Sequence, residues 1–184
     1  MNARMPLENT DTIGLVCALL VRFPEIASLR SMPGAGTVRL TFAVAKKLDA
    51  TTAREAAAEI KDHVFSFVAL HDAQSPEITV DCEFDRTTTF LHVSRDLDTF
   101  TKDELGLVVA LVSERFSDAL VRNPTAEHHP DEDPSAQDEL VEVAIEALRD
   151  PAQSKSLVGF REEKRVLVYF LKKSAKKAKA SARR

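Results

Sequence analysis

Residues 76–104, PEITVDCEFDRTTTFLHVSRDLDTFTKDE, contain the clearest structural pattern in the chain. From Ile78 to Asp85, apolar side chains alternate with polar ones, and this period of two predicts a strand with one buried side. The polar residues 85–88 can form a turn, after which the chain is expected to return as a second strand that ends near Ser94. The stretch therefore predicts a β-hairpin with two antiparallel strands.

A similar pattern occurs earlier in the chain, which suggests an internal repeat. Pro24-Glu25-Ile26 recurs as Pro76-Glu77-Ile78, and Leu48-Asp49-x-x-Thr52-x-x-Glu55 recurs as Leu97-Asp98-x-x-Thr101-x-x-Glu104. Each unit has the order helix, proline, strand, strand. We expect two such αββ units to pack about a pseudo-twofold axis; the alternative is that these short motifs recur by chance.

The elements around the hairpin follow from the same rules. Helices are predicted over residues 10–22, from the N-cap Thr52 to about residue 70, and from the N-cap Thr101 to a stop at Asn123-Pro124. Strands are predicted over residues 26–31, where the pattern is weak, and 38–44, where it is clear. The turn between them contains Pro33 and two glycines. The core domain is therefore expected to span residues 1–123 in the order αββαββα.

The remaining chain is expected to add a linker, a docking element and a tail. Residues 124–134 contain acidic residues and prolines without a helical pattern, which is typical of an acidic linker. A fourth helix is predicted with Ser135 as its N-cap, followed by a hairpin. The run Val166–Leu171 is apolar on both sides, and such a strand is normally buried on both faces. We therefore expect residues 135–171 to dock onto the core, or to pair with a second copy, as a degenerate third αββ unit.

These elements define the expected fold class, α+β. Duplicated αββ units form an antiparallel sheet with helices packed on one face, and the C-terminal helix–hairpin element is added to it. The composition agrees with this class, because 44% hydrophobic and 29% charged residues are typical of a globular domain. Only five of the 184 residues are glycine, which argues against a protein built around glycine-rich phosphate loops.

Charge is unevenly distributed along the chain. Residues 172–184 contain seven basic residues and no acidic one, so residues 1–171 hold 18 of the 25 Lys and Arg, all 29 Asp and Glu, and a net charge of −11. This acidic body is a poor general binder of nucleic acid, because phosphate contacts need Lys and Arg. The basic tail is expected to be disordered and to contact RNA phosphates without sequence specificity, or only to solubilise the chain. Its basic residues are Lys172, Lys173, Lys176, Lys177, Lys179, Arg183 and Arg184.

A second candidate surface is the polar side of the predicted sheet. The side chains expected there are Arg39, Thr41, Asp81, Glu83, Phe90 and His92. A histidine beside carboxylates can serve acid–base chemistry. The polar side of an antiparallel sheet is also, in the simplest case, the side that water covers. A third interpretation is that this face meets a partner protein, a second subunit or the C-terminal hairpin.

No residue pattern indicates catalysis, a metal site or a cofactor. The sequence lacks a phosphate loop, a dinucleotide-binding fingerprint, a nucleophile elbow and zinc-ligand spacing. His128-His129 lies among carboxylates, but a linker lacks the rigid scaffold that a metal site needs. Cys17 and Cys82 are expected to be small buried residues of a protein in the reducing cytoplasm. The apolar run Ile13–Val21 is too short to span a membrane, so no membrane contact is expected.

The sequence leaves two functions open. The first is a non-enzymatic cytoplasmic interaction protein that binds a protein partner, or itself, through a sheet face and contacts RNA or ribosomes through its tail. The second is a small-molecule-binding protein or enzyme that uses the polar sheet face around His92, Asp81 and Glu83. A concave pocket with converging side chains would favour the second function, and a flat or shared face would favour the first.

Overall fold

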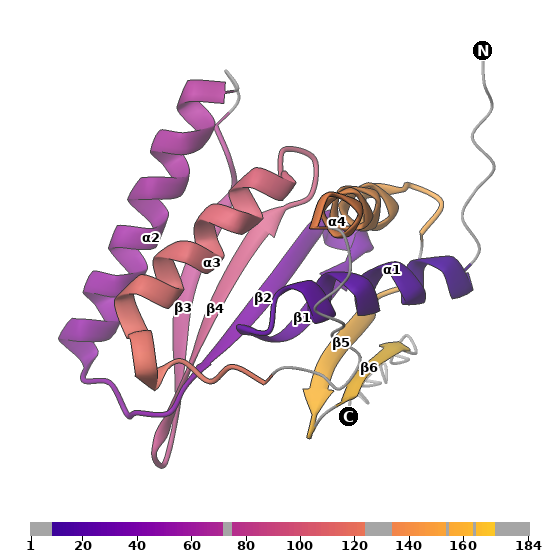
Figure 1. The fold of residues 1–184 in the computed structure, drawn as a ribbon. Coiled ribbons are helices and arrows are strands. Elements are labelled where there is room, and N and C mark those ends of the chain that lie inside the picture. The colour runs from indigo at the N-terminus through magenta and orange to yellow at the C-terminus, as the bar shows by residue number, and fades with distance from the viewer. Residues whose placement is uncertain (1–8, 72–74, 124–133, 154, 164, 172–184) are drawn as a thin grey trace, which may run out of the picture.

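The computed structural model describes residues 9–71, 75–123, 134–153, 155–163 and 165–171, and these residues form one antiparallel sheet with helices on one side (Figure 1). Two short 3₁₀ turns, η1 and η2, complete the elements. In chain order they are α1 (Asn9–Arg22), β1 (Ile26–Met32), η1 (Pro33–Ala35), β2 (Thr37–Val44), α2 (Ala50–His71), β3 (Ile78–Asp85), β4 (Thr88–Asp96), α3 (Lys102–Phe116), η2 (Ser117–Ala119), α4 (Pro134–Arg149), β5 (Leu157–Glu162) and β6 (Arg165–Phe170).

The strand order is β3-β4-β2-β1-β5-β6, and every neighbouring pair is antiparallel. The hairpin β1–β2 therefore sits at the centre. Its second strand pairs with the second strand of the hairpin β3–β4, and its first strand pairs with the first strand of the hairpin β5–β6. The predicted α+β class, with an antiparallel sheet and helices on one face, is confirmed. The duplication of the αββ unit stays a prediction.

The weak pattern of the first strand has a structural cause in β1. Ile26 pairs with Phe42 and Ser28 pairs with Thr41, so Ala27 is an extra residue that forms a bulge. The bulge lets Ile26 and Leu29 both face the helices, although they are three residues apart in the sequence. The turn after β1 ends at Gly36, whose φ of 61° is a left-handed conformation that glycine adopts without strain.

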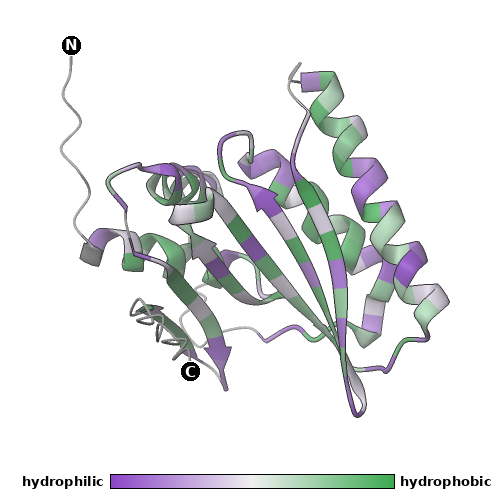
Figure 2. Cartoon of the chain, turned by 180° about the vertical axis from the view of Figure 1, so that it is seen from behind, coloured by the Kyte–Doolittle hydropathy of each residue, from purple (hydrophilic) through white to green (hydrophobic). Residues whose placement is uncertain are grey.

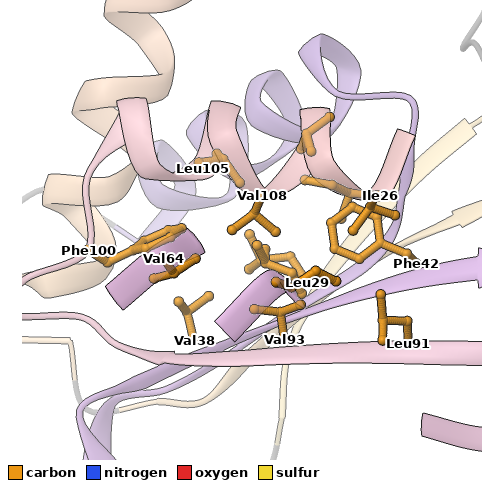
Figure 3. Packing of buried hydrophobic residues seen from close by; sticks show 14 of the residues in the cluster. Ile26, Leu29, Val38, Phe42, Val64, Leu91, Val93, Phe100, Leu105 and Val108 are labelled. Atoms are coloured by element: carbon orange, nitrogen blue, oxygen red, sulfur yellow. The ribbon is translucent and has the colours of Figure 1, made fainter. Parts of the chain in front are cut away.

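The hydrophobic core lies between the sheet and the helices. Alternate residues of the central strands β2 and β4 point toward α2 and α3, and Figure 3 shows their side chains meeting those of the helices. The labelled members of this cluster are Ile26, Leu29, Val38, Phe42, Val64, Leu91, Val93, Phe100, Leu105 and Val108. α2 and α3 pack over one end of the sheet, and α1 and α4 pack over the other (Figure 1). The opposite side of the sheet is covered by no helix of the described residues.

The two predicted capping boxes have different structures. Thr101 is the N-cap of α3, and its hydroxyl oxygen accepts from the backbone N–H of Glu104 at 3.2 Å, as predicted. The prediction that Thr52 is the N-cap of α2 is wrong, because the helix begins at Ala50. Asp49 caps it instead, accepting from the backbone N–H of Thr52 at 2.9 Å and from its hydroxyl at 2.6 Å. A carboxylate directly before the helix replaces the hydroxyl that the motif suggested.

The predicted end of the third helix is also wrong. α3 ends at Phe116 rather than at Asn123, and Ser117 takes a φ of 43°. The chain then runs beside the end of β2, where Leu120 forms a bridge with Val44. The bulged strand β1 does not extend this far along β2. Leu120 is buried there. Its apolar side chain, which fits the spacing of a longer helix, therefore makes a strand-like contact with β2 instead.

The C-terminal element docks onto the core through pairing of β5 with β1. α1 packs closely over β5 at Gly159, where a Cβ atom would lie 2.7 Å from Leu20 Cδ1. The guanidinium of Arg161 donates to the backbone oxygens of Leu20, Phe23, Ile26 and Asn123. One side chain of β5 thus satisfies carbonyls at the end of α1 and the start of β1, and it fixes the hairpin to the core.

Two details of this C-terminal region differ from the prediction. α4 begins at Pro134, so Ser135 lies in its first turn and is not the N-cap. The run 166–171 is not buried on both faces: β6 is the last strand of the sheet, and Tyr169 is 53% exposed. Of the expected linker, residues 124–133 lie outside the described residues, as does the basic tail from residue 172.

Candidate interaction surface on the open side of the sheet

The side of the sheet without helices, called here the open side, contains all six residues that the sequence placed on a polar face. Figure 2 shows the sheet from this direction, with the helices behind it. Strand pairing arranges the residues in rows across the sheet: Asp81 is opposite His92, and His92 is opposite Thr41. In the adjacent rows Glu83 is opposite Phe90, and Arg39 is opposite Ser94. The register therefore brings these side chains together on one side of the sheet.

His92 is the centre of a polar cluster on β2, β3 and β4. Its Nδ1 lies 3.0 Å from the hydroxyl oxygen of Thr41, and its Nε2 lies 3.6 Å from Glu83 Oε2. With the ring hydrogen on Nε2, the Thr41 hydroxyl donates to Nδ1 and the ring faces the carboxylate. The imidazole is mostly covered, at 14% exposure, whereas Glu83 is 75% exposed. This hydroxyl–imidazole–carboxylate arrangement is the one feature of the open side that acid–base chemistry could use.

The surroundings of His92 provide little else that catalysis requires. β2 and β4 are interior strands, so their backbone N–H groups are used in pairing with neighbours and none is left to stabilise an oxyanion. Burial and the nearby Asp81 carboxylate raise the pKa of the Cys82 thiol, which disfavours the nucleophilic thiolate form. Stabilisation of a negative charge that develops beside His92 would have to come from the guanidinium of Arg39, one row away.

Two arginines lie side by side near the middle of the open side. Arg30 of β1 is the register partner of Arg39 of β2. The guanidinium of Arg39 donates through Nε to Ser94 Oγ at 2.9 Å. Within the described residues neither arginine forms an ion pair. Like charges directly opposite each other on neighbouring strands destabilise a sheet. This Arg30–Arg39 pair is therefore a feature that folding does not favour and that an anionic group would complement.

An apolar patch follows the arginines toward β6. Arg30 is opposite Val158, which is opposite Tyr169; Phe160 is opposite Leu167 in the next row. The rings of Phe160 and Tyr169 are 6.1 Å apart and tilted, a geometry that aromatic pairs favour. The four side chains Val158, Phe160, Leu167 and Tyr169, called here the apolar patch, are half-buried or exposed. The open side therefore changes from acidic at β3, through the arginine pair, to apolar at β6.

Sequence reasoning missed Arg30 and the apolar patch as site residues. Arg30 lies on the bulged strand, where the alternation that assigns faces is broken, and β5 has no clean alternation either. The sequence does contain one signal for the apolar patch: in the run Val166–Leu171, the residues that face each side of the sheet are apolar. The run predicts burial on both faces, whereas two of its residues, Leu167 and Tyr169, belong to the apolar patch.

A second charged cluster lies on the helix-covered side and has a different character. Arg95 is 1% exposed and Glu104 is 0% exposed; their side chains are joined by two bonds, Nε to Oε1 at 2.5 Å and Nη2 to Oε2 at 2.9 Å. Arg95 also donates to Asp96, to Thr99 Oγ1 at 2.9 Å and to the backbone oxygen of Glu77 at 3.3 Å. Its donors are used within the fold, which identifies this cluster as structural.

Other expectations about sites have mixed outcomes. Within the described residues no group of three or more His, Cys, Asp or Glu is placed to hold a metal ion. His128-His129 and the tail lysines and arginines lie outside those residues. Cys17 and Cys82 are not joined in a disulfide, and both are half-buried. In the described part of the chain, no helix combines the length and apolarity needed to cross a membrane.

Comparison with known protein families, curated proteins and solved structures yields no significant match. The functional argument therefore depends on the geometry of the chain itself.

Proposed function

We propose that this chain is a non-enzymatic cytoplasmic interaction protein that binds a protein partner through the open side of its sheet. The observation that carries the proposal is the Arg30–Arg39 pair beside the apolar patch, on a sheet face that no helix of the described residues covers. A partner with an acidic side chain next to apolar ones would complement this surface. Arginine suits such contacts, because its guanidinium can bind a carboxylate through two parallel hydrogen bonds.

The basic tail adds a second proposed contact, with RNA or ribosomes. Seven positive charges within residues 172–184 would attract a polyanion through release of its counterions. The tail contains no aromatic side chain for base stacking, so the contact would not read sequence. If about five of these residues contact single-stranded RNA, log K should fall with log salt at a slope of about −3.5. The net charge of −11 on residues 1–171 opposes this attraction.

Affinity capture from cells that produce the protein tests both contacts. The full chain and residues 1–171 are captured with and without nuclease treatment, and bound proteins are quantified. The proposal predicts a set of proteins that survives nuclease and does not depend on the tail, and a second set that requires both the tail and intact RNA. If no protein survives nuclease in either sample, the open side is not a protein-binding surface. If both sets are unchanged without the tail, the tail is not the RNA contact.

The second candidate function is an enzyme or small-molecule-binding protein at the Thr41–His92–Glu83 cluster. The distances of 3.0 Å from His92 Nδ1 to the Thr41 hydroxyl and 3.6 Å from His92 Nε2 to the Glu83 carboxylate favour it. They place a general base between a hydroxyl and a carboxylate. A fluorophosphonate probe tests this candidate: a reactive hydroxyl would be labelled at Thr41, and labelling would be lost in Thr41→Val and in His92→Gln. No labelling of Thr41 in the folded chain would remove the enzyme that uses this hydroxyl as its nucleophile.

A further inference from the structure

The two edges of the sheet are protected very differently. At one edge, β3 has the acidic residues Asp81, Glu83 and Asp85 along its open side. A helix packs against each edge strand, α2 against β3 and α1 against β6, so the difference lies in the side chains of the strands. At the other edge, β6 begins with the charged residue Arg165, and the five residues Val166–Phe170 that follow are uncharged and include no proline. Charged side chains and prolines are the usual devices that keep a sheet edge from pairing with another strand. β3 has three such charges along its open side, whereas the described residues of β6 have one, Arg165 beside the turn.

The hydrogen bonding of β6 shows which of its backbone groups are free. The N–H of Leu171 donates to Ser156 O at 2.7 Å, and Glu162 and Arg165 are register partners across a two-residue turn. In an antiparallel pair, alternate residues direct their N–H and C=O groups to the same neighbour. Positions 165, 167, 169 and 171 therefore face β5. The N–H and C=O groups of Val166, Val168 and Phe170 point outward at the free edge.

The sequence of β6 is complementary to itself in antiparallel pairing. Placing Val168 opposite Val168 of a second copy joins all three outward-facing residues, since Val166 then lies opposite Phe170. On the open side the same register places Leu167 opposite Tyr169. Both of these cross-strand pairs join a branched aliphatic side chain to an aromatic one, which is a favourable combination. No charge within Val166–Phe170 opposes another in this register.

We infer that β6 is a homodimerisation edge: two copies of this chain pair antiparallel through β6 about a two-fold axis at Val168 and form one continuous sheet. The axis is perpendicular to the sheet, so the helices of both copies lie on the same side. The two apolar patches then join across the axis, because Leu167 and Tyr169 of each copy meet those of the other. This inference does not depend on the proposed function. If both hold, the dimer offers two arginine pairs flanking one apolar patch to a partner.

The test is sedimentation of the full chain over a range of concentrations. The wild-type chain should sediment as a dimer that dissociates on dilution. Tyr169→Lys should weaken dimerisation at least about tenfold, because it places an ammonium group opposite an apolar leucine at both ends of the interface. Phe84→Lys, a matched change of an exposed aromatic residue on the edge strand β3, should leave dimerisation unchanged. Thermal melts confirm that each variant is folded.

A mixing experiment tests the register and does not depend on the effect of any single variant. Leu167→Glu chains mixed with Tyr169→Lys chains should form a heterodimer, because the introduced carboxylate and ammonium groups lie opposite each other at one end and the other end stays wild type. Tyr169→Glu mixed with Tyr169→Lys should not, because the two charges then face leucines. A wild-type chain that is monomeric at all concentrations, or equal association in both mixtures, would overturn the inference. A wild-type chain that dimerises but captures no protein after nuclease treatment would contradict the proposed function alone.

Discussion

Arginine occurs on both sides of the sheet, and its surroundings on the two sides differ in a way that separates structure from function. Arg95 faces the helices, is 1% exposed and is bonded to Glu104, Asp96 and Thr99. Arg30 and Arg39 face the open side, opposite each other and without an ion pair among the described residues. On the helix side the fold satisfies the hydrogen-bond preferences of the guanidinium. On the open side no carboxylate of the described residues pairs with the two guanidinium groups.

This contrast implies that residues on the helix side determine stability and residues on the open side do not. Changes that remove helix-side contacts should therefore lower the free energy of unfolding strongly. Changes on the open side should leave it almost unchanged and alter binding. The predictions below test this difference, beginning with the largest expected effect.

Truncation after Asp150 should have the largest effect. It removes β5 and β6, which uncovers the free edge of β1 and the side of α1 that packs on Gly159, and it deletes Arg161. We expect aggregation or a large fall in Tm, because a continuous apolar surface is then left in water. Light scattering and a thermal melt measure this. A truncated chain that stays in solution with the Tm of the full chain would show that the C-terminal element is not part of the fold.

Removing one partner of the buried ion pair should come next. Glu104→Ala leaves the guanidinium of Arg95 buried without its main partner and should cost about 3–5 kcal/mol of unfolding free energy. The double variant Arg95→Leu with Glu104→Leu removes both charges and should cost clearly less than Glu104→Ala alone. Urea unfolding of wild type and both variants measures this. Equal losses in the single and double variants would argue against the buried pair as the cause.

The two helix caps should give smaller effects. Thr101→Ala removes a cap hydrogen bond and should cost about 1 kcal/mol, and Asp49→Ala should also lower stability, because it removes the cap of α2. Thr52→Ala should cost less than either, because Thr52 lies inside the helix and its backbone N–H still donates to Asp49. Urea unfolding ranks the three variants. A loss for Thr52→Ala as large as that for Asp49→Ala would contradict this assignment of the cap.

Asp49 also gives the cap a pH dependence. Hydrogen bonds from the side chain and backbone of Thr52 hold the pKa of Asp49 below its ordinary value of 3.8. A carboxylate whose pKa is lowered on folding stabilises the fold above its unfolded pKa, and this contribution is lost as the pH falls through the folded value. Wild type should therefore lose more stability than Asp49→Asn as the pH falls from about 5 into the acid range, since titration begins about one pH unit above the unfolded pKa. Parallel acid-unfolding curves would contradict this.

The open side should give the smallest change in stability. Arg30→Thr removes one of two like charges on neighbouring strands, so the free energy of unfolding should stay within about 0.5 kcal/mol of wild type and is expected to rise. Urea unfolding measures this at low ionic strength, where repulsion between exposed charges is least screened. A loss comparable to that of the cap variants would mean that Arg30 has a role in folding.

Much of this fold follows from local patterns in the sequence. The hairpin at residues 78–96 and the helix that begins after Thr101 were predicted because alternation and capping are properties of short segments. The same reasoning failed where a local motif has two solutions, as when Asp49 rather than Thr52 caps α2. It also failed at Leu120, whose apolar side chain packs beside β2 and not along a longer α3.

The candidate surface was predictable only in part, for a related reason. Asp81, Glu83 and His92 lie on cleanly alternating strands, so the sequence assigned their side of the sheet correctly. Arg30 lies beyond the bulge at Ala27, where counting by two gives the wrong face. Tyr169 lies on a strand whose neighbours are set by long-range pairing, and no local pattern states that β6 is an edge.

The central claim is that the open side of the sheet, and specifically the Arg30–Arg39 pair, is the surface that binds a partner. Two charge-reversed chains test it directly by quantitative capture after nuclease treatment. One is Arg30→Glu with Arg39→Glu on the open side; its control is Arg54→Glu with Lys61→Glu on the exposed face of α2, which changes the net charge equally. The account predicts that the first chain loses its bound proteins while the control retains them, with both chains folded. Retention by both chains, or equal loss from both, would contradict it.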